Sequence, residues 1–258
     1  MGVTVTVLAV EHEDGAGAGL VGERLVADGV PLDVRRPWRG EELPGGLAGH
    51  GGLLVLGGSV GCRDDDAAPW LGRVRGLVRE AVRREVPLLG ICLGGQVVAD
   101  ALGGTVAPRR RAPEVGSVPL RRLPGAVGDP VFGGVPDGAP AAQWHFDEIT
   151  RLPEGAVPLL GGDDCAHQAY RVGPVAWGTQ FHPEADGDAI AAWAREDAAL
   201  VRSRGGDPDA AVASVRRDAA ALRAVWGAVA GAWGRVVRER AARDAAGSGG
   251  TGGPGAVA

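Results

Sequence analysis

A short apolar run that ends in a glycine-rich turn constrains this chain more than any other feature. Residues 86–89 have the composition of a buried strand, and Gly90-Ile91-Cys92-Leu93-Gly94-Gly95-Gln96 follows directly. Glycines on both sides of the cysteine allow a sharp turn from strand to helix, because they have no Cβ atom to collide with neighbouring backbone. The pattern predicts a nucleophile elbow with Cys92 at its apex, although a small buried core cysteine is the alternative.

The elbow also predicts how the thiol is activated. The first N–H groups of the following helix carry positive partial charge, which favours a thiolate at Cys92. The N–H of Leu93, one residue further on, is placed to donate a hydrogen bond to an oxyanion. A cysteine in this position can therefore act as a nucleophile toward a carbonyl carbon.

A second motif supplies the base that such a nucleophile needs. Gln180-Phe181-His182-Pro183-Glu184 follows the strand-like run 175–179. Residues two apart in an extended segment point the same way, so Glu184 can hold one imidazole nitrogen of His182 while the other faces a thiol. A hydrogen-bonded structural histidine is the alternative for His182 alone. Together the two motifs predict a catalytic triad of Cys92, His182 and Glu184.

These two motifs resemble those of the class I, triad-type glutamine amidotransferases, in particular the stand-alone members related to the glutaminase domain of GMP synthase. Two further segments agree with the resemblance. The run 54–60 is similar to the strand and glycine loop of that family, and Trp144-His145-Phe146-Asp147 is similar to its Trp-His-Gly-Asp segment. Ser59 and Phe146 depart from the family pattern, in which proline and glycine are common at these positions, so we expect an altered substrate loop.

The resemblance implies both a reaction and a site. The reaction is hydrolysis of glutamine or a γ-glutamyl amide through a thioester on Cys92, with release of glutamate and of ammonia or an amine. No cofactor and no metal are implied. The oxyanion hole would be formed by the N–H groups of Gly58 and Leu93. Residues implied in binding the substrate are Gly57, Gln96, His145 and Phe146.

The composition limits what this chain itself can do with the released ammonia. All 27 basic residues are arginine, which excludes a lysine nucleophile and a phosphate-binding loop with the essential lysine. The ammonia would then pass to a separate synthetase subunit, unless the protein is a γ-glutamyl hydrolase that is not coupled to a synthetase. A third possible function is that of a binding subunit that has the glutaminase fold but no catalytic activity. The intact triad argues against it.

Other global features predict a cytoplasmic enzyme that binds neither nucleic acid nor membrane. The net charge of −5 gives no basic signal for nucleic acid. Cys62, Cys92 and Cys165 are too few and too scattered for a disulfide framework or a zinc site with paired ligands. The N-terminal residues 2–10 read as a strand rather than a signal peptide, and no apolar run approaches the length of a membrane helix.

Strand-like and helical patterns alternate along most of the chain, which predicts an α/β fold with an open, mostly parallel sheet and helices on both faces. This is the flavodoxin-like arrangement that the resemblance implies. Strands are expected at 31–34 and 52–56, and a helix after the aspartates 64–66, which read as a solvated turn. Between residues 105 and 175 short antiparallel strands are expected. Ligands of such sheets bind at the carboxyl ends of the strands, so the glycine loop, Cys92 and His182 should converge on one cleft.

Three parts of the chain are expected: the glutamine amidotransferase domain at 1–205, a helical extension at 206–246 and a flexible glycine-rich tail at 247–258. The extension carries an apolar stripe at helical spacing, formed by Val212, Val215, Leu222, Val225, Trp226, Val229, Trp233 and Val236. This stripe predicts packing against the parent domain, with docking of a partner or of a second copy in a homodimer as the alternative.

Two further sets of residues, an arginine run and two histidines, each have two possible interpretations. Arg109-Arg110-Arg111 reads as a solvated loop, or else as a site for an acidic substrate or partner. His12 reads as structural, but it and His145 could line the cleft from loops.

Overall fold

The computed structural model describes residues 5–248. The predicted tail begins at Gly247, and its residues 249–258 lie outside the described part of the chain, as do residues 1–4. Helix α5 (Pro208–Ser248) includes Gly247 and Ser248, which were expected in the tail.

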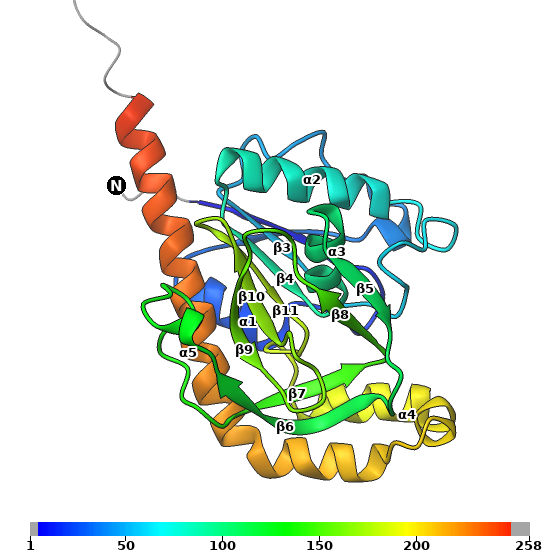
Figure 1. The fold of residues 1–258 in the computed structure, drawn as a ribbon. Helices are drawn as coiled ribbons and strands as arrows, with labels where there is room; N and C mark the ends of the chain where they lie inside the picture. Colours follow the sequence, from blue (N-terminus) through cyan, green and yellow to red (C-terminus); the bar gives the residue numbers. More distant parts are fainter. Residues whose placement is uncertain (1–4, 249–258) are drawn as a thin grey trace, which may run out of the picture.

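Half of the central sheet is parallel (Figure 1). Its nine strands lie in the order β2-β1-β3-β4-β11-β10-β9-β6-β7, and every neighbouring pair from β2 to β11 is parallel. These strands are β2 (Leu32–Arg35), β1 (Val7–Val10), β3 (Gly52–Val55), β4 (Leu88–Ile91) and β11 (Ala176–Thr179). All four residues of β1, β3, β4 and β11 are buried, as expected for parallel strands covered by helices on both sides. The predicted parallel α/β sheet is confirmed.

The other half of the sheet is antiparallel, as predicted for residues 105–175. It contains β10 (Ala169–Val172), β9 (Val157–Gly161), β6 (Glu114–Arg122) and β7 (Ala139–His145). A separate antiparallel pair is formed by β5 (Thr105–Pro108) and β8 (Asp147–Arg151). Two short 3-10 turns, η1 (Pro37–Arg39) and η2 (Pro124–Ala126), complete the connections.

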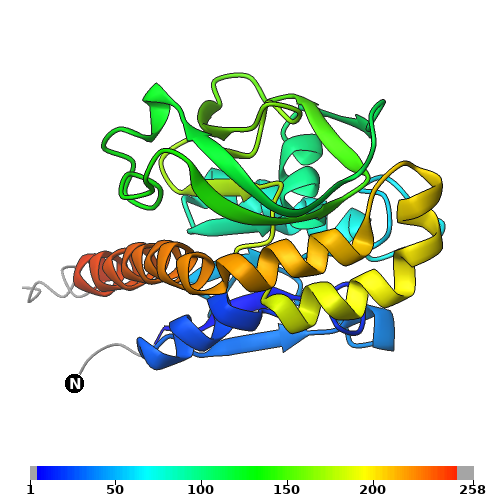
Figure 2. The ribbon, with the colours of Figure 1, turned by 90° about the horizontal axis from the view of Figure 1, so that it is seen from below.

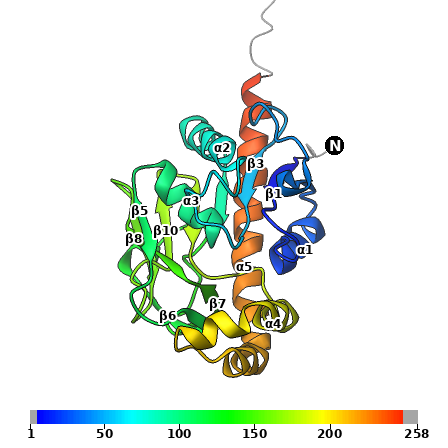
Figure 3. The ribbon, with the colours of Figure 1, turned by 90° about the vertical axis from the view of Figure 1, so that its right-hand side faces the viewer.

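Helices cover the two faces of the sheet and divide the core in two (Figure 3). On one face α2 (Leu71–Arg84) and α3 (Leu93–Ala101) bury Leu77 and Val97 against the parallel strands. On the other face α1 (Gly19–Ala27), α4 (Gly187–Ser203) and α5 pack in a second core. In α1 the side chains of Leu20, Val21 and Leu25 are buried, whereas Val26 is 59% exposed.

The long helix α5 packs along its own domain (Figure 2). It contacts α1, α4, β6 and β7. Trp226 packs against the ring of Phe181 at a centroid distance of 4.4 Å, and its Nε1–H donates a 2.9 Å hydrogen bond to the carbonyl oxygen of Pro140. Toward its end, Arg238 donates to the carbonyl of Asp28, the residue that caps α1. The predicted packing against the parent domain is confirmed, and the apolar stripe is covered by the chain itself.

The arginine run after β5 is only partly a solvated loop. Arg109 is buried, and its guanidinium donates to Glu148 Oε2 at 3.0 Å, whereas Arg110 and Arg111 are exposed. Asp64, Asp65 and Asp66 are exposed, as expected for a solvated turn. Across residues 5–248, no helix combines the length and the apolar character that crossing a membrane requires.

Candidate functional site

The predicted elbow is present between β4 and α3. Cys92 has φ +49° and ψ −107°, a backbone conformation that residues other than glycine rarely adopt. The flanking glycines allow α3 to lie directly on the sheet. A Cβ atom at Gly94 would collide with the carbonyl of Val55, and one at Gly95 with the carbonyl of Thr179. The turn therefore needs glycine at both positions, and it holds Cys92 at the carboxyl end of β4.

His182 and Glu184 reach the same place from the neighbouring strand. They follow β11, which pairs in parallel with β4. His182 Nδ1 lies 2.7 Å from Glu184 Oε1, and both side chains are 5% exposed. The N–H of His182 donates to the carbonyl of Ala142 on β7 at 2.8 Å, which fixes the backbone at this point. Nε2 of the imidazole lies 3.4 Å from the carbonyl oxygen of Trp144. Cys92 lines the same cavity as His182 and is close enough to act on the pKa of the imidazole, so the structure brings all three residues together.

The electrostatics favour a charged imidazole. Burial by itself lowers the pKa of His182, but the charge of Glu184 and the interaction with Cys92 outweigh it. The pKa of His182 is therefore held well above its usual value. The ring of Trp193, on α4, lies against the imidazole at a centroid distance of 4.6 Å. An imidazolium between a carboxylate and a thiolate is the charge arrangement of an activated cysteine nucleophile.

The glycine loop after β3 lies against both residues. A Cβ atom at Gly57 would lie 3.2 Å from His182 Cε1, and one at Gly58 would lie 3.0 Å from Leu93 Cδ2. The Gly94 N–H donates to the carbonyl of Leu56 at 3.1 Å, which ties the elbow to this loop. The Leu93 N–H belongs to the first turn of α3, where amides have no acceptor within the helix. Gly58 and Leu93 are thus adjacent, as expected for an oxyanion hole.

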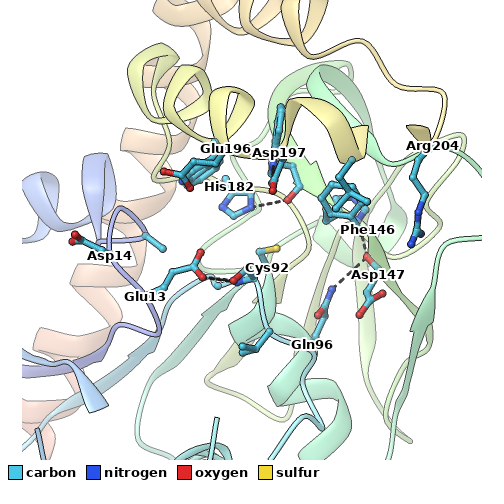
Figure 4. Close-up of a pocket in the computed structure, with 18 residues that line it drawn as sticks. Glu13, Asp14, Cys92, Gln96, Phe146, Asp147, His182, Glu196, Asp197 and Arg204 are labelled. Atoms are coloured by element: carbon cyan, nitrogen blue, oxygen red, sulfur yellow. Dashed lines mark hydrogen bonds between the residues drawn. The ribbon is translucent and has the colours of Figure 1, made fainter. Parts of the chain in front are cut away.

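Cys92 opens into a cavity of about 540 Å³ (Figure 4). Gly58, Gln96, His145, Phe146 and His182 also line it, whereas Gly57, Leu93 and Glu184 are outside its lining. The side chain of Gln96 is buried, and its Nε2 donates to the backbone carbonyl of Asp147 at 3.3 Å. Of the predicted substrate-binding residues, Gln96, His145 and Phe146 therefore line the same cavity as the thiol, whereas Gly57 lies beside the imidazole.

The two departures from the family pattern have visible consequences. The N–H of Ser59 donates to Glu13 Oε2 at 3.0 Å, and its hydroxyl donates to the same oxygen. Proline has no N–H and could not make the first of these bonds. Phe146 is half-buried and lines the cavity. The altered loop therefore places a carboxylate and an aromatic ring at the cavity wall.

Sequence reasoning missed one whole wall of the cavity, which α4 provides. Trp193, Glu196, Asp197 and Leu200 of this helix line the cavity, and so does Arg204, which follows its last residue. Their spacing of three or four residues is a helical signal, and the helix begins directly after the His182 motif. Glu13 and Asp14, in the loop after β1, complete the opposite wall and were also missed.

His12 is structural. It is buried beneath the glycine loop, with its Cβ at 2.9 Å from the Cβ position of Gly58, and its Nδ1 accepts a 3.0 Å hydrogen bond from Trp70 Nε1. Burial lowers its pKa to about 4, so the ring is neutral near pH 7. His12 therefore supports the glycine loop and does not line the cavity.

His145, by contrast, lines the cavity and belongs to a buried polar network behind it. Its Nε2 lies 2.8 Å from Glu114 Oε2, which also accepts a 2.8 Å hydrogen bond from Gln168. Glu114, His145 and Cys165 bring ligand atoms within 4.8 Å of one another. Arg109 lies 3.8 Å from the same carboxylate oxygen, and burial raises the pKa of the Cys165 thiol to about 12. A nearby cation and a protonated thiol disfavour a metal ion, so these residues form a hydrogen-bonded support.

Known proteins share both the sequence pattern and the fold. The sequence profile of the family "Glutamine amidotransferase class-I" matches residues 24–191. The glutamine-hydrolysing GMP synthase of Porphyromonas gingivalis is 34% identical over 145 residues, which are 55% of this chain and 26% of that protein. The match thus spans about a quarter of the length of that relative.

Solved structures give the same result over more of the chain. A glutamine amidotransferase from Methylobacillus flagellatus has a TM-score of 0.77 at 29% identity and covers 90% of this chain and 94% of its own. One from Thermotoga maritima has a TM-score of 0.79 at 24% identity, with 90% and 98% covered, and supports the fold. Because the family profile covers more than half of the residues, including every predicted site residue, the chain belongs to the class I glutamine amidotransferases.

Proposed function

We propose that this protein hydrolyses the side-chain amide of glutamine, or of a γ-glutamyl amide, through a thioester on Cys92. The observation that carries the proposal is the Cys92–His182–Glu184 arrangement, in which a strained cysteine and a charged imidazole meet at the ends of two adjacent parallel strands. The relatives that share this segment include GMP synthases named as glutamine-hydrolysing.

In the first half of the reaction, the Cys92 thiolate attacks the amide carbonyl carbon. The carbonyl oxygen becomes an oxyanion, which accepts hydrogen bonds from the N–H groups of Leu93 and Gly58. As the tetrahedral intermediate collapses, the carbon–nitrogen bond breaks and the His182 imidazolium gives its proton to the leaving nitrogen. Ammonia or an amine departs, and a γ-glutamyl thioester remains on Cys92.

In the second half, water attacks the thioester carbon. The now neutral His182 takes a proton from this water, and the carbon–sulfur bond breaks to restore the thiolate and release glutamate. Glu184 holds the Nδ1–H of the imidazole throughout, so that Nε2 faces the reacting atoms. Each proton that His182 gives in the first half is recovered in the second.

The proposal has two versions, which differ in whether the released ammonia is passed to another protein. In the first, a separate synthetase subunit accepts it, as the GMP synthase relatives suggest. In the second, the protein is an uncoupled γ-glutamyl hydrolase. A cavity of about 540 Å³ is in the size range of sites for drug-sized ligands, so its volume is compatible with a substituted amide as well as with glutamine.

Purified protein incubated with glutamine and with a panel of γ-glutamyl amines tests the proposal, with glutamate release as the readout. We expect turnover by the wild type, none by Cys92→Ala, and a γ-glutamyl adduct on Cys92 in mass spectra of rapidly quenched samples. Preference for glutamine supports ammonia delivery, and preference for a substituted amide supports the uncoupled hydrolase. Equal turnover by wild type and Cys92→Ala would overturn the mechanism, and no turnover of any compound would favour a binding subunit.

A further inference from the structure

The two proposed oxyanion donors are held in place by different means. Within residues 5–248, neither the Gly58 N–H nor the Leu93 N–H has a hydrogen-bond acceptor, so both are available to a ligand. Leu93 belongs to the first turn of α3, and the helix fixes the direction of its N–H. Gly58 lies in the irregular loop between β3 and α2. The direction of its N–H therefore depends on contacts from outside that loop.

The sequence of this loop leaves the backbone at Gly58 free to rotate. Gly57 and Gly58 are adjacent, and glycine has the widest range of backbone conformations. A proline at the next position would restrict the residue before it through its ring. Ser59 imposes no such restriction. A contact through space is therefore needed if Gly58 is to keep one conformation.

Glu13 makes such a contact from the loop after β1 (Figure 4). Its Oε2 accepts a 3.0 Å hydrogen bond from the Ser59 N–H and a second hydrogen bond from the Ser59 hydroxyl. The first of these bonds fixes the peptide plane that joins Gly58 to Ser59, and a carboxylate acceptor makes it stronger than a bond between neutral groups. In the described part of the chain, Glu13 has this contact and no ion pair.

The segment that carries Glu13 is itself anchored against the glycine loop. The preceding residue, His12, is buried, and a Cβ atom at Gly58 would lie 2.9 Å from its Cβ. The His12 ring accepts a 3.0 Å hydrogen bond from Trp70 Nε1. Two consecutive residues of the loop after β1 therefore contact two consecutive residues of the glycine loop. This pairing makes the Glu13 carboxylate a fixed acceptor.

We propose that Glu13 is a positioning residue for the oxyanion hole, which keeps the Gly58 N–H in place beside Leu93 through its two hydrogen bonds to Ser59. The inference rests on the proposed function, because an oxyanion forms only if Cys92 attacks an amide carbonyl. Glu13 itself does not touch the reacting atoms. It keeps a donor oriented before the substrate arrives, so that no reorganisation is needed in the transition state.

Variants at the two ends of this contact test the role on glutamine hydrolysis. Glu13→Ala should lower kcat about tenfold with KM unchanged, since complete loss of an oxyanion donor costs on the order of a hundredfold or more. Glu13→Gln keeps an acceptor oxygen and should lose no more than about threefold. Ser59→Pro added to Glu13→Ala restricts Gly58 through the ring and should restore most of kcat. Exposed Glu42→Ala, outside the cavity, is the control.

Iodoacetamide separates the oxyanion hole from the thiol. It alkylates Cys92 by direct displacement of iodide, without a tetrahedral oxyanion, so Glu13→Ala and the wild type should react at equal rates. Slower alkylation of Glu13→Ala would show that Glu13 acts on the thiol, and a rise in KM with unchanged kcat would show that it binds substrate. Either result would overturn the positioning role, and so would a double variant no faster than Glu13→Ala.

Hydrogen exchange keeps the inference testable if turnover is absent. Ser59 is exposed, yet its N–H should exchange slowly in the wild type and in Glu13→Gln because it is hydrogen-bonded. We expect exchange about ten times faster in Glu13→Ala, measured by NMR. Equal exchange in Glu13→Ala and the wild type would overturn the positioning role and leave the proposed hydrolysis standing. Slow exchange without glutamate release from any substrate would overturn the hydrolysis and leave the contact standing.

Discussion

The parallel and antiparallel halves of the sheet differ in what they bury beside the cavity. The parallel strands are buried and largely apolar, and they present Cys92 and His182 at their carboxyl ends. The antiparallel half buries polar side chains instead, with Glu114, Gln168 and His145 linked by hydrogen bonds. Backbone geometry thus places the proposed reacting groups, whereas a side-chain network supports the cavity wall at His145. Substitutions in the two halves should therefore have different kinetic signatures.

The largest effect is expected at the nucleophile. Cys92→Ala should lower kcat for glutamine hydrolysis on the order of 10⁴-fold or more, because no other group in the cavity can form the thioester. Its thermal unfolding midpoint should stay close to that of the wild type, since the change removes one small sulfur atom. Calorimetry together with glutamate release measures both. A large drop in the unfolding midpoint would mean that the parallel half needs the thiol for stability.

The next effect concerns the charge behind the imidazole. Glu184→Gln should lower kcat on the order of a hundredfold, with exposed Glu154→Gln as control. Glu184 helps to hold the pKa of His182 above its usual value, so its loss lowers that pKa. The imidazolium then disappears at lower pH, and the descending limb of the kcat/KM profile should move toward lower pH. A limb that stays in place would show that another group sets it.

Crowding at the elbow gives the largest expected stability effect. Gly94→Ala places a methyl group against the carbonyl of Val55 and should lower the free energy of unfolding by about 3 kcal/mol. Gly76→Ala on α2 is the matched control, because a Cβ there meets nothing within 4 Å. That control should raise stability by about 0.5–1 kcal/mol. Urea titrations of both variants decide this, and equal stabilities would contradict the close packing of α3.

The antiparallel half is tested by removing its central carboxylate. Glu114→Ala leaves His145 and Gln168 without their acceptor and should cost about 2–3 kcal/mol of stability. We expect KM for glutamine to rise while kcat changes little, since the network supports the wall rather than the thiol. Exposed Glu42→Ala is the control. A fall in kcat with unchanged KM would remove the distinction between the two halves.

The smallest effect separates two tryptophans on α5. Trp226→Phe keeps the ring contact with Phe181 but loses the hydrogen bond to Pro140, and should cost about 1 kcal/mol. Trp233 is also buried, but its Nε1 has no hydrogen-bond partner among the described residues. Trp233→Phe should therefore cost less than Trp226→Phe. The reverse order in thermal unfolding would show that packing, not the hydrogen bond, anchors α5.

Much of the parallel half could be predicted because its signals are local. The elbow depends on glycines next to Cys92, and the His182–Glu184 contact depends on residues two apart in an extended segment. The stripe of α5 predicted its packing for the same reason, since helical spacing is visible in the sequence. The end of that helix at Ser248 was less predictable, because helix boundaries depend on weak terminal preferences.

The substrate wall could not be predicted in the same way. Arg109 is adjacent to two exposed arginines, yet it is buried against Glu148, a residue distant in sequence. The place of α4 above Cys92 likewise depends on how the helix packs after it leaves the His182 motif. Such contacts depend on how many side chains compete for buried space. The spacing of residues in the sequence does not reveal the outcome of that competition.

The sequence by itself determined the groups on which the proposed chemistry depends: a cysteine at a glycine-flanked turn, and a histidine with its carboxylate at the end of a second strand. These features follow from short-range backbone geometry, in which each residue constrains its immediate neighbours. Only the tertiary structure decided what surrounds the thiol, including the wall formed by α4 and the place of Asp147 and Arg204 in the cavity lining. These residues come from segments that meet only after the sheet is assembled, because their proximity depends on long-range packing.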